Sequence, residues 1–355
     1  MKPSALQYLA CINCKSDLIL REDETIPVDS SEAREIISGL LTCVDCLRHY
    51  PITRGVPRLI NSQMSSAVDM NTGDRFGEAW KEFPRLDESY SQQFFDWIEP
   101  VDSSFLDGKI VLEAGAGKGR HAQIVAASGA MVTLAIDIGD AIDVAYQNVG
   151  HLPNLHLIQS DIRKLPFKKI FDFAFSVGVL HHMEDPKAGF TSVVDCLADH
   201  GSISIWVYGK ENNWWITNIV SPVRESLTAK LPSAVLKVVS TTLSIPVFLS
   251  AKTIVGPYAQ LRKGSPKWLP ELFYESYLAY ISKFDFTEIN HIVFDHLIAP
   301  VAYYIPRADV ESWFKDAGFT NPLIRWHNKN SWSGFASRAT SDVKQVLNKL
   351  SKARV

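Results

Sequence analysis

Two groups of residues in this sequence have types and spacings that could do chemistry. The first is a pair of CxxC elements, and the second is a glycine loop, "VLEAGAGKGRH" at residues 111–121, whose glycines stand at alternate positions. Two CxxC elements can bring four thiolates to one tetrahedral metal ion. A glycine loop after an apolar run lets the backbone approach a nucleotide closely, because no Cβ intervenes. The sequence therefore indicates a metal site in one part of the chain and a nucleotide site in another.

The paired cysteines favour a structural zinc site. A closed set of four thiolates suits Zn²⁺ and leaves no open coordination position for catalysis. Redox chemistry is the alternative, but it requires one CxxC next to a βαβ unit and not two of them. We expect the zinc ligands to be Cys11, Cys14, Cys43 and Cys46.

The residues around these cysteines resemble the Trm112-like zinc-ribbon family. The stretches "LACINCKSDLIL" and "LLTCVDCLRHYPITRGVPRLI" carry the resemblance, although the proline common inside the first CxxC of that family is absent. Members of the family often serve methyltransferases as partner subunits or as fused modules. The family signature after the second CxxC is matched by Tyr50, Pro51, Ile52, Gly55, Val56 and Pro57.

Three cofactors compete for the glycine loop. A phosphate-binding Walker A loop needs Gly-Lys followed by Ser or Thr, but Lys118 is followed by Gly119. A dinucleotide fingerprint needs a glycine where Arg120 stands. The remaining candidate is S-adenosylmethionine (SAM), whose loop follows the form (Glu/Asp)-x-Gly-x-Gly-x-Gly. That form is present here as Glu113, Gly115, Gly117 and Gly119.

Two acids farther along the chain favour SAM. Asp137 ends the apolar run "MVTLAID", where a carboxylate can accept hydrogen bonds from both ribose hydroxyls, although NAD enzymes use the same position. Asp161 follows the run "NLHLIQS", where an acid can accept a hydrogen bond from an adenine amino group. Its neighbour Ile162 offers an apolar contact for the adenine ring.

These residues require elements that place them at one edge of a sheet. "KIVLEAG" is typical of a buried parallel strand, "RHAQIVAASGA" of a helix, and "MVTLAID" of the next strand. This β-loop-α-β order predicts the nucleotide-binding half of a doubly wound α/β sheet. Further strands are expected at "NLHLIQS", "FDFAFSV" and "SISIWVYGK".

Together these segments resemble the class I SAM-dependent methyltransferases, specifically the UbiE-like group (methyltransferase type 11), over residues 109–208. The resemblance implies a Rossmann-like sheet of seven strands. It also implies that the methionine part, the ribose and the adenine of SAM are held in that order along the motifs. The expected cofactor-binding residues are Glu113, Gly115, Ala116, Gly117, Asp137, Ile138, Asp161, Ile162, Ser176 and Val177.

Two histidines after the fourth expected strand are candidates for the chemical step. Methyl transfer from a sulfonium is an in-line displacement, so the protein mainly has to orient the nucleophile. A base is needed only if the acceptor must lose a proton. We therefore expect a catalytic role for His181 or His182, with hydrogen bonding to the scaffold as the alternative.

A long insertion, residues 209–303, precedes the helix expected at 306–319 and the closing hairpin. We expect a helical cap on the substrate side of the sheet. Within it, residues 224–267 carry seven basic residues and one acid, together with apolar stretches that Pro246 interrupts. A basic outer face, an entrance for an anionic or amphiphilic substrate, and peripheral contact with a membrane surface stay open as interpretations. Candidates for the acceptor pocket are His296, Tyr303 and Tyr304.

The segment "DRFGEAWKEFP" before the sheet places Phe76 and Trp80 on one helical face. We expect these aromatic rings to close over the cofactor, with Arg75 near its carboxylate. Packing against the zinc module is the alternative. The expected organisation is a zinc ribbon at 1–60, linker and lid helices at 61–100, a methyltransferase domain at 101–340 and a tail at 341–355.

Composition narrows the expected partners. The net charge is -3 at pH 7, whereas general nucleic-acid binders are usually basic, so a nucleic-acid partner is disfavoured. The first 15 residues lack the apolar core of a signal peptide, which favours the cytoplasm. We expect a SAM-dependent methyltransferase that modifies an oxygen or nitrogen of a small or amphiphilic metabolite. An RNA base methyltransferase and a non-catalytic SAM-binding scaffold are the alternatives, and the oligomeric state is left open.

Overall fold

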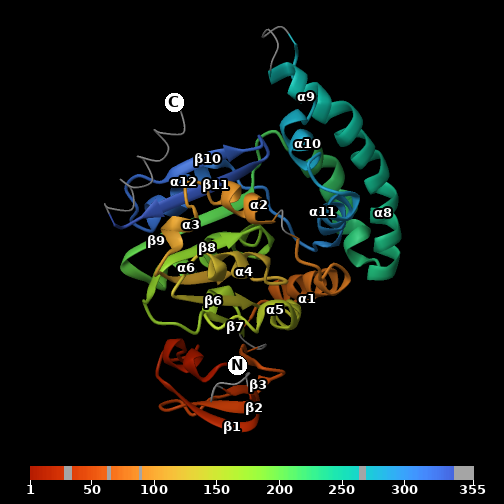
Figure 1. The fold of residues 1–355 in the computed structure, drawn as a ribbon. Coiled ribbons are helices and arrows are strands. Elements are labelled where there is room, and N and C mark those ends of the chain that lie inside the picture. The colour runs from red at the N-terminus through yellow and green to blue at the C-terminus, as the bar shows by residue number, and fades with distance from the viewer. Residues whose placement is uncertain (28–33, 62–64, 88–89, 264–268, 340–355) are drawn as a thin grey trace.

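The computed structural model describes residues 1–27, 34–61, 65–87, 90–263 and 269–339 (Figure 1). One sheet of 11 strands runs through the described chain in the order β1-β2-β3-β4-β7-β6-β5-β8-β9-β11-β10. Helices pack on both of its faces, so the expected α/β fold with a doubly wound sheet is confirmed.

The expected seven-stranded sheet consists of the strands β5 to β11. Five of its strands, β7-β6-β5-β8-β9, pair in parallel, and the hairpin of β11 and β10 adds to β9 in the antiparallel sense. The parallel strands are apolar almost throughout because both of their faces are covered. The strands are β5 (Ile110–Ala114), β6 (Val132–Asp137), β7 (Leu155–Ser160), β8 (Phe171–Val177), β9 (Leu197–Tyr208), β10 (Leu323–His327) and β11 (Ser331–Ser337).

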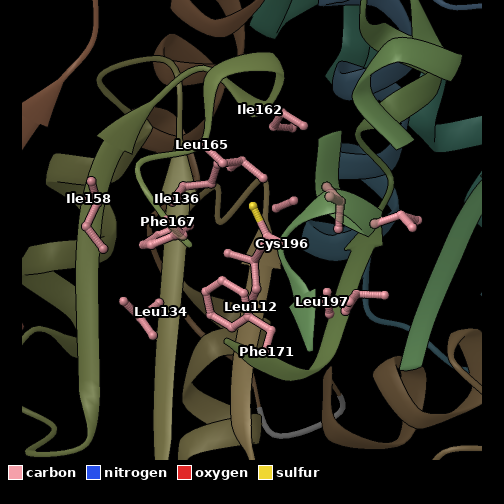
Figure 2. Packing of buried hydrophobic residues seen from close by; sticks show 14 of the residues in the cluster. Leu112, Leu134, Ile136, Ile158, Ile162, Leu165, Phe167, Phe171, Cys196 and Leu197 are labelled. Carbon is pink, nitrogen blue, oxygen red and sulfur yellow. The ribbon is translucent and has the colours of Figure 1, made fainter. Parts of the chain in front are cut away.

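Alternate residues of each strand enter different cores, because successive side chains point to opposite faces of a sheet. Val111 packs in a cluster with α2 and α4, whereas Leu112 packs on the other face with Phe190 of α6. Figure 2 shows the cluster that contains Leu112, in which Cys196 lies among aliphatic and aromatic side chains. Cys196 is buried, and burial raises the pKa of its thiol to about 11, so it serves as a core residue and not as a nucleophile.

Helices flank the strands in the order that the sequence predicts. Asp185 caps α6 by accepting a hydrogen bond from the Ala188 amide, with Pro186 in the first turn. The helices outside the insertion are α1 (Ala67–Glu82), α2 (Tyr90–Trp97), α3 (Ser103–Leu106), α4 (Arg120–Ala127), α5 (Ala141–Val149), α6 (Pro186–Asp195) and α12 (Arg307–Asp316).

The N-terminal module extends the same sheet, which the sequence does not predict. Its last strand, β4, pairs in parallel with β7, so that Arg58 lies opposite Gln159 and Leu59 opposite Ser160. Figure 1 shows the module at one end of the sheet, below β7. The strands are β1 (Leu18–Pro27), β2 (Arg34–Cys43), β3 (His49–Thr53) and β4 (Val56–Leu59).

The insertion is helical, as expected, but Pro246 does not interrupt its longest helix. The chain stays helical from Ser233 to Lys263, and a π-helical segment at 250–255 follows the proline. The helix tolerates the loss of one backbone hydrogen bond at Pro246, so the expected break was wrong. The helices are α7 (Ser221–Ser226), α8 (Ser233–Leu249), α9 (Gly256–Lys263), α10 (Glu275–Ile281) and α11 (Phe286–Ile298).

This long helix packs only in part on the rest of the molecule. Figure 1 shows α8 and α9 along the outer side of the insertion, with α11 between α8 and the body of the protein. By length and composition the helix could cross a membrane, with a mean hydropathy of 1.7 and 22% of its most apolar window buried. The expected C-terminal tail at 341–355 and Lys267 of the basic segment lie outside the described residues.

Candidate active site

A cavity of about 580 Å³ opens at the carboxyl ends of β5, β6, β7 and β8. The strand order reverses at this point, because β6 lies on one side of β5 and β8 on the other. Ligands of open α/β sheets bind at such a reversal. One wall of the cavity comes from the loops after these strands, and the other walls come from α1 and from the insertion, including α11.

The glycine loop after β5 has a shape that only glycine can adopt. Gly115 has φ +98°, and a Cβ there would lie 2.2 Å from the side chain of Val179. Gly117 has φ +52°, and a Cβ there would lie 3.1 Å from the indole of Trp80. The loop therefore presents bare backbone to the cavity, held between the loop after β8 and helix α1.

The structure brings most of the predicted cofactor residues to this cavity. Glu113 and Ser176 are exceptions, since both are buried inside strands and neither lines the cavity. The Ser176 hydroxyl donates a hydrogen bond to the carbonyl of Ala114 (2.9 Å), which ties β8 to β5. The predicted residues that line the cavity are Gly115, Ala116, Gly117, Asp137, Ile138, Asp161, Ile162 and Val177.

Glu113 is a buried carboxylate behind the loop. Neither of its carboxylate oxygens has a hydrogen-bond partner among the described residues, and Nδ1 of His121 lies 3.3 Å from Oε1. Burial raises the pKa of Glu113 well above its ordinary value and lowers that of His121 well below its own. Burial thus favours the neutral form of both groups, and the pair supports the loop from inside the core.

Asp137, at the end of β6, holds the loop directly. Its Oδ2 accepts the Gly117 amide (2.9 Å), and its Oδ1 accepts the Gly139 amide (3.0 Å). Burial raises the pKa of Asp137 to about 6, although these amides oppose the shift. The carboxylate keeps further lone pairs, because each of its oxygens can accept more than one hydrogen bond.

Asp161 follows β7 and is almost fully buried. It caps the next turn by accepting the Arg163 amide (2.8 Å). The Arg163 guanidinium lies between this carboxylate, at 3.4 Å, and that of Asp69 in α1, at 3.0 Å. The contact joins the expected lid helix to the adenine side of the expected cofactor site.

The two expected catalytic histidines have different surroundings. Nδ1 of His182 lies 2.6 Å from the carbonyl of Val301, so Nδ1 carries the proton and Nε2 keeps a lone pair. Burial lowers the pKa of His182 to about 3, and its ring lines the cavity. His181 is fully buried outside the cavity wall, and its ring centroid lies 3.9 Å from that of Tyr208.

Aromatic residues of β9 and the insertion form one end of the cavity. Tyr208 stacks with His296 at 5.3 Å and with Tyr304 at 5.5 Å between ring centroids, and all three line the cavity. We call this end the aromatic arm (Tyr208, His296 and Tyr304). Tyr303, the remaining candidate for the acceptor pocket, is 44% exposed and does not line the cavity.

The expected lid is partly in place. Phe76 and Trp80 both line the cavity from α1, but Arg75 does not. The Arg75 guanidinium instead binds Glu78 Oε2 (2.7 Å) and donates to the carbonyl of Leu231 (2.8 Å). Arg75 therefore joins α1 to the insertion and lies away from the place expected for a cofactor carboxylate.

Arg120 occupies the cavity where Arg75 was expected. Its guanidinium lies 5.6 Å from the ring of Trp80, 5.1 Å from that of Tyr90 and 5.5 Å from that of Trp97. Cations over aromatic faces are held in place without losing their capacity to bind an anion. In the sequence, Arg120 is marked only by its position at the start of the helix after the glycine loop, where a dinucleotide fingerprint has a glycine.

Helix α11 contributes a polar face that sequence reasoning missed. Glu288 Oε2 accepts the hydroxyl of Tyr90 (2.7 Å), and His291 Nε2 lies 3.4 Å from Asp295 Oδ2. These α11 side chains line the cavity opposite Arg120. No local motif marks them, because they reach the site only through the packing of the insertion on α1.

The four expected zinc ligands converge in the N-terminal module. Their Sγ atoms all lie within 4.8 Å of one another, with Cys11 and Cys46 at 3.5 Å and Cys14 and Cys43 at 3.4 Å. One tetrahedral ion with Zn–S bonds of about 2.3 Å fits thiolates at this spacing. The donor set and its geometry thus suit a structural zinc ion.

Comparisons with known proteins identify a methyltransferase domain in this chain. Residues 112–205 match the family model of a methyltransferase domain. A tRNA U34 carboxymethyltransferase of Ruthia magnifica subsp. Calyptogena magnifica is 30% identical over 102 residues, which are 28% of this chain and 32% of that protein. The enzyme of the same name from Pseudoalteromonas translucida is 36% identical over 92 residues, 25% of this chain and 27% of its own. The chain thus spans about a third of the curated relatives that it matches.

Solved structures resemble the chain more distantly. A SAM-dependent methyltransferase from Aquifex aeolicus has a TM-score of 0.41 at 13% identity, covering 74% of this chain and 98% of its own. A complex of the Haloferax volcanii Trm112 methyltransferase activator with a methyltransferase has a TM-score of 0.42 at 10% identity, covering 78% and 99%.

The family match confirms the prediction of a methyltransferase domain and supports SAM as its cofactor. The matched relatives are named for an activity on tRNA. That finding overturns the expectation that nucleic acid is not a partner. The expectation rested on the overall charge of -3, which does not report how charge is distributed over the surface.

Proposed function

We propose, from the methyltransferase domain at residues 112–205, that this protein transfers the methyl group of SAM to a base of RNA. The observation that carries the proposal is the arrangement at the carboxyl ends of the strands. The bare backbone of the glycine loop, Asp137 and Asp161 meet at one cavity, in the order that the motifs require. RNA was the alternative acceptor at the level of sequence, and the named activity of the relatives now favours it.

The residues of the cavity fit SAM by their chemistry. Asp137 offers lone pairs to ribose hydroxyls, and Asp161 with Ile162 offers an acceptor and an apolar face to adenine. We assign the carboxylate of the methionine part to Arg120, since this cation lines the cavity and is held over the rings of Trp80, Tyr90 and Trp97. When bound, SAM supplies a sulfonium-activated methyl group for in-line displacement.

The acceptor side orients the nucleophile. His182 is neutral above about pH 4, because burial lowers its pKa to about 3, and its Nε2 can accept a hydrogen bond from an attacking hydroxyl or amino group. The hydrogen bond from Nδ1 to the Val301 carbonyl fixes the orientation of the ring. Holding a nucleophile in line can lower the barrier by several kcal/mol, so a strong base is not required.

Two features support an RNA base as the acceptor. The aromatic arm offers ring faces on which a planar base can stack after leaving the RNA strand. Residues 224–267 of the insertion include seven basic residues and one acid. Exposed Lys230 and Lys263 are available there for phosphate contacts.

We assign a structural zinc ion to the four cysteines of the N-terminal module. Their Sγ atoms already lie close enough for one ion, and no position is left for a substrate. These thiolates would hold the zinc ion, which would tie the two CxxC loops together in the module whose last strand, β4, pairs with β7.

The experiment is a transfer assay with SAM labelled in the methyl group. Purified protein is incubated with total tRNA, with nuclease-treated tRNA and with a metabolite extract, and an Asp161→Ala variant serves as the inactive control. We expect label in intact RNA alone, and mass spectrometry of the nucleosides then identifies the modified base. Label confined to metabolites would refute the RNA acceptor and leave the SAM site standing. Calorimetry that detects no SAM binding would refute both.

A further inference from the structure

Arg224 is a buried cation with no adequate partner in the described chain. The residue is 0% exposed, and its Nε has no hydrogen-bond partner. Its Nη2 lies 3.3 Å from Ser221 Oγ and 3.3 Å from Glu225 Oε1, but the Glu225 side chain is 58% exposed. A solvent-screened ion pair of this kind contributes little, whereas burying a guanidinium is costly. The fold therefore maintains a positive charge in its interior that the exposed Glu225 compensates only in part.

Arg224 lies behind the wall of the cavity, where its charge can act on a bound ligand. Ile216 and Val220 line the cavity, and Arg224 follows Val220 by one helical turn on the same side of the chain. Its guanidinium lies beside the hydroxyl of Tyr304 in the aromatic arm and opposes the effect of burial on the pKa of that tyrosine. Among the described residues, the Tyr304 hydroxyl has no well-aligned hydrogen-bond partner either. Two unsatisfied polar groups thus meet at the end of the arm.

The neighbouring side chains do not neutralise Arg224. Burial lowers the pKa of His296 to about 4 and that of His182 to about 3, so these rings are neutral at pH 7. The acids that line the cavity have other partners: Glu288 and Asp295 lie near His291, Asp69 and Asp161 bind Arg163, and Asp137 accepts backbone amides. Arg224 does not itself line the cavity, so its charge acts on an occupant of the aromatic arm from behind Tyr304, the neighbouring residue that does.

We propose that the end of the aromatic arm is an oxyanion subsite, in which Tyr304 donates to an anionic group carried by the acceptor and Arg224 supplies the compensating charge. This inference rests on the proposed function, because it assigns the arm to the acceptor. The ligand class is an aromatic or heteroaromatic ring that bears a carboxylate or a phosphate. The ring stacks on Tyr208, and its oxyanion reaches Tyr304.

Arg224 has here the role of a positioning residue, since it acts beside Tyr304. Losing one hydrogen bond or ion pair to a charged group costs about tenfold to a hundredfold in affinity. We expect Arg224→Met to lose that factor for anionic ligands and to leave neutral ligands of the same shape unaffected. A side chain that only maintained the fold would weaken both kinds of ligand equally.

The test uses two pairs of probes on the full chain, measured by ligand-observed NMR titration. Benzoate is compared with its neutral isostere benzamide, and uridine 5′-phosphate is compared with uridine. We expect the anion of at least one pair to bind more tightly, and that preference to disappear in Arg224→Met and to return in Arg224→Lys. The first pair identifies a ring carboxylate and the second a phosphate. Equal binding within both pairs, or an unchanged preference in Arg224→Met, overturns the subsite.

Two further measurements separate this inference from folding defects and from the proposed function. Tyr304→Phe keeps the ring and removes the donor, so it should reduce the preference for anions even if Arg224→Met does not fold. The thermal midpoint of Arg224→Met should be no lower than that of the wild type, because a buried charge that is compensated only in part is removed. A subsite that binds anions in a protein that fails to methylate RNA would refute the proposed acceptor alone.

Discussion

Asp137 offers the sharpest test of the cofactor site, through the substitution Asp137→Asn. The carboxylate accepts two amides, from Gly117 and Gly139, and it also offers its remaining lone pairs to the cavity. An asparagine presents one amide group as a donor, so one of the two backbone donors loses its acceptor and the ribose loses a charged one. At about 1.5 to 3 kcal/mol for a hydrogen bond to a charged group, we expect SAM to bind about tenfold to a hundredfold more weakly.

The pKa of Asp137 adds a signature in pH. Burial raises it from 3.8 to about 6, and this difference corresponds to about 3 kcal/mol. The folded chain holds the proton more tightly than the unfolded chain, so the free energy of unfolding decreases as the pH rises from about 4 to about 6. SAM affinity changes in the opposite direction, because binding the ribose needs the ionised carboxylate. Asp137→Asn should abolish both changes.

Calorimetry with SAM between pH 5 and 7.5, together with urea unfolding from about pH 4 to about pH 7, measures both effects. The matched control is Asp140→Asn, an exposed aspartate three residues farther along whose only described ion pair is with Lys81 at 3.5 Å. The control should keep the wild-type affinity and its pH profile. An Asp137→Asn variant with unchanged affinity, or a wild type whose affinity is independent of pH, would refute the reasoning.

The remaining predictions concern the loop, the zinc and the chemical step. Gly115→Ala should lower the free energy of unfolding by at least about 2 kcal/mol in urea unfolding and abolish SAM binding. Gly108→Ala, also at positive φ but with open space around it, should lower the free energy of unfolding by less. Equal costs would contradict the packing argument. Cys14→Ser should lower the zinc content below one equivalent by metal analysis, and Cys196→Ser should retain it. His182→Ala should lower kcat about tenfold to a hundredfold with an unchanged SAM Kd, and an unchanged kcat would exclude it from orienting the acceptor.

The cofactor half of the site was predictable because its residues are local. Asp137 and Asp161 stand where apolar runs end, and the carboxyl ends of parallel strands meet at one edge of a sheet. The two residues that miss the cavity, Glu113 and Ser176, lie inside β5 and β8. There the pleat directs both side chains into the packed interior, whereas Asp137 and Val177, the last residues of β6 and β8, line the cavity.

The acceptor half was not predictable in the same way. Helix α11 reaches the cavity through contacts with α1 and α8, which are far away in the sequence, and no local pattern encodes them. Arg75 and Arg120 illustrate the difficulty, since both are basic residues near cofactor motifs and only the packing decides which one enters the cavity. Charge balance over the whole chain was equally uninformative about the acceptor, because a cavity senses only the charges around it.

The zinc module and the cofactor site are parts of one sheet, and this connection has a consequence for both. Arg58 of β4 binds Asp143 of α5 (2.5 Å) and Gln159 of β7 (3.2 Å), and Gln159 in turn donates to the carbonyl of Ile138 (2.9 Å), the residue after Asp137. A continuous set of hydrogen bonds therefore joins β4 to the strand end that holds the expected ribose site. Since β4 covers an edge of β7 that would otherwise expose unpaired backbone groups, loss of zinc should loosen the cofactor site as well as the module itself.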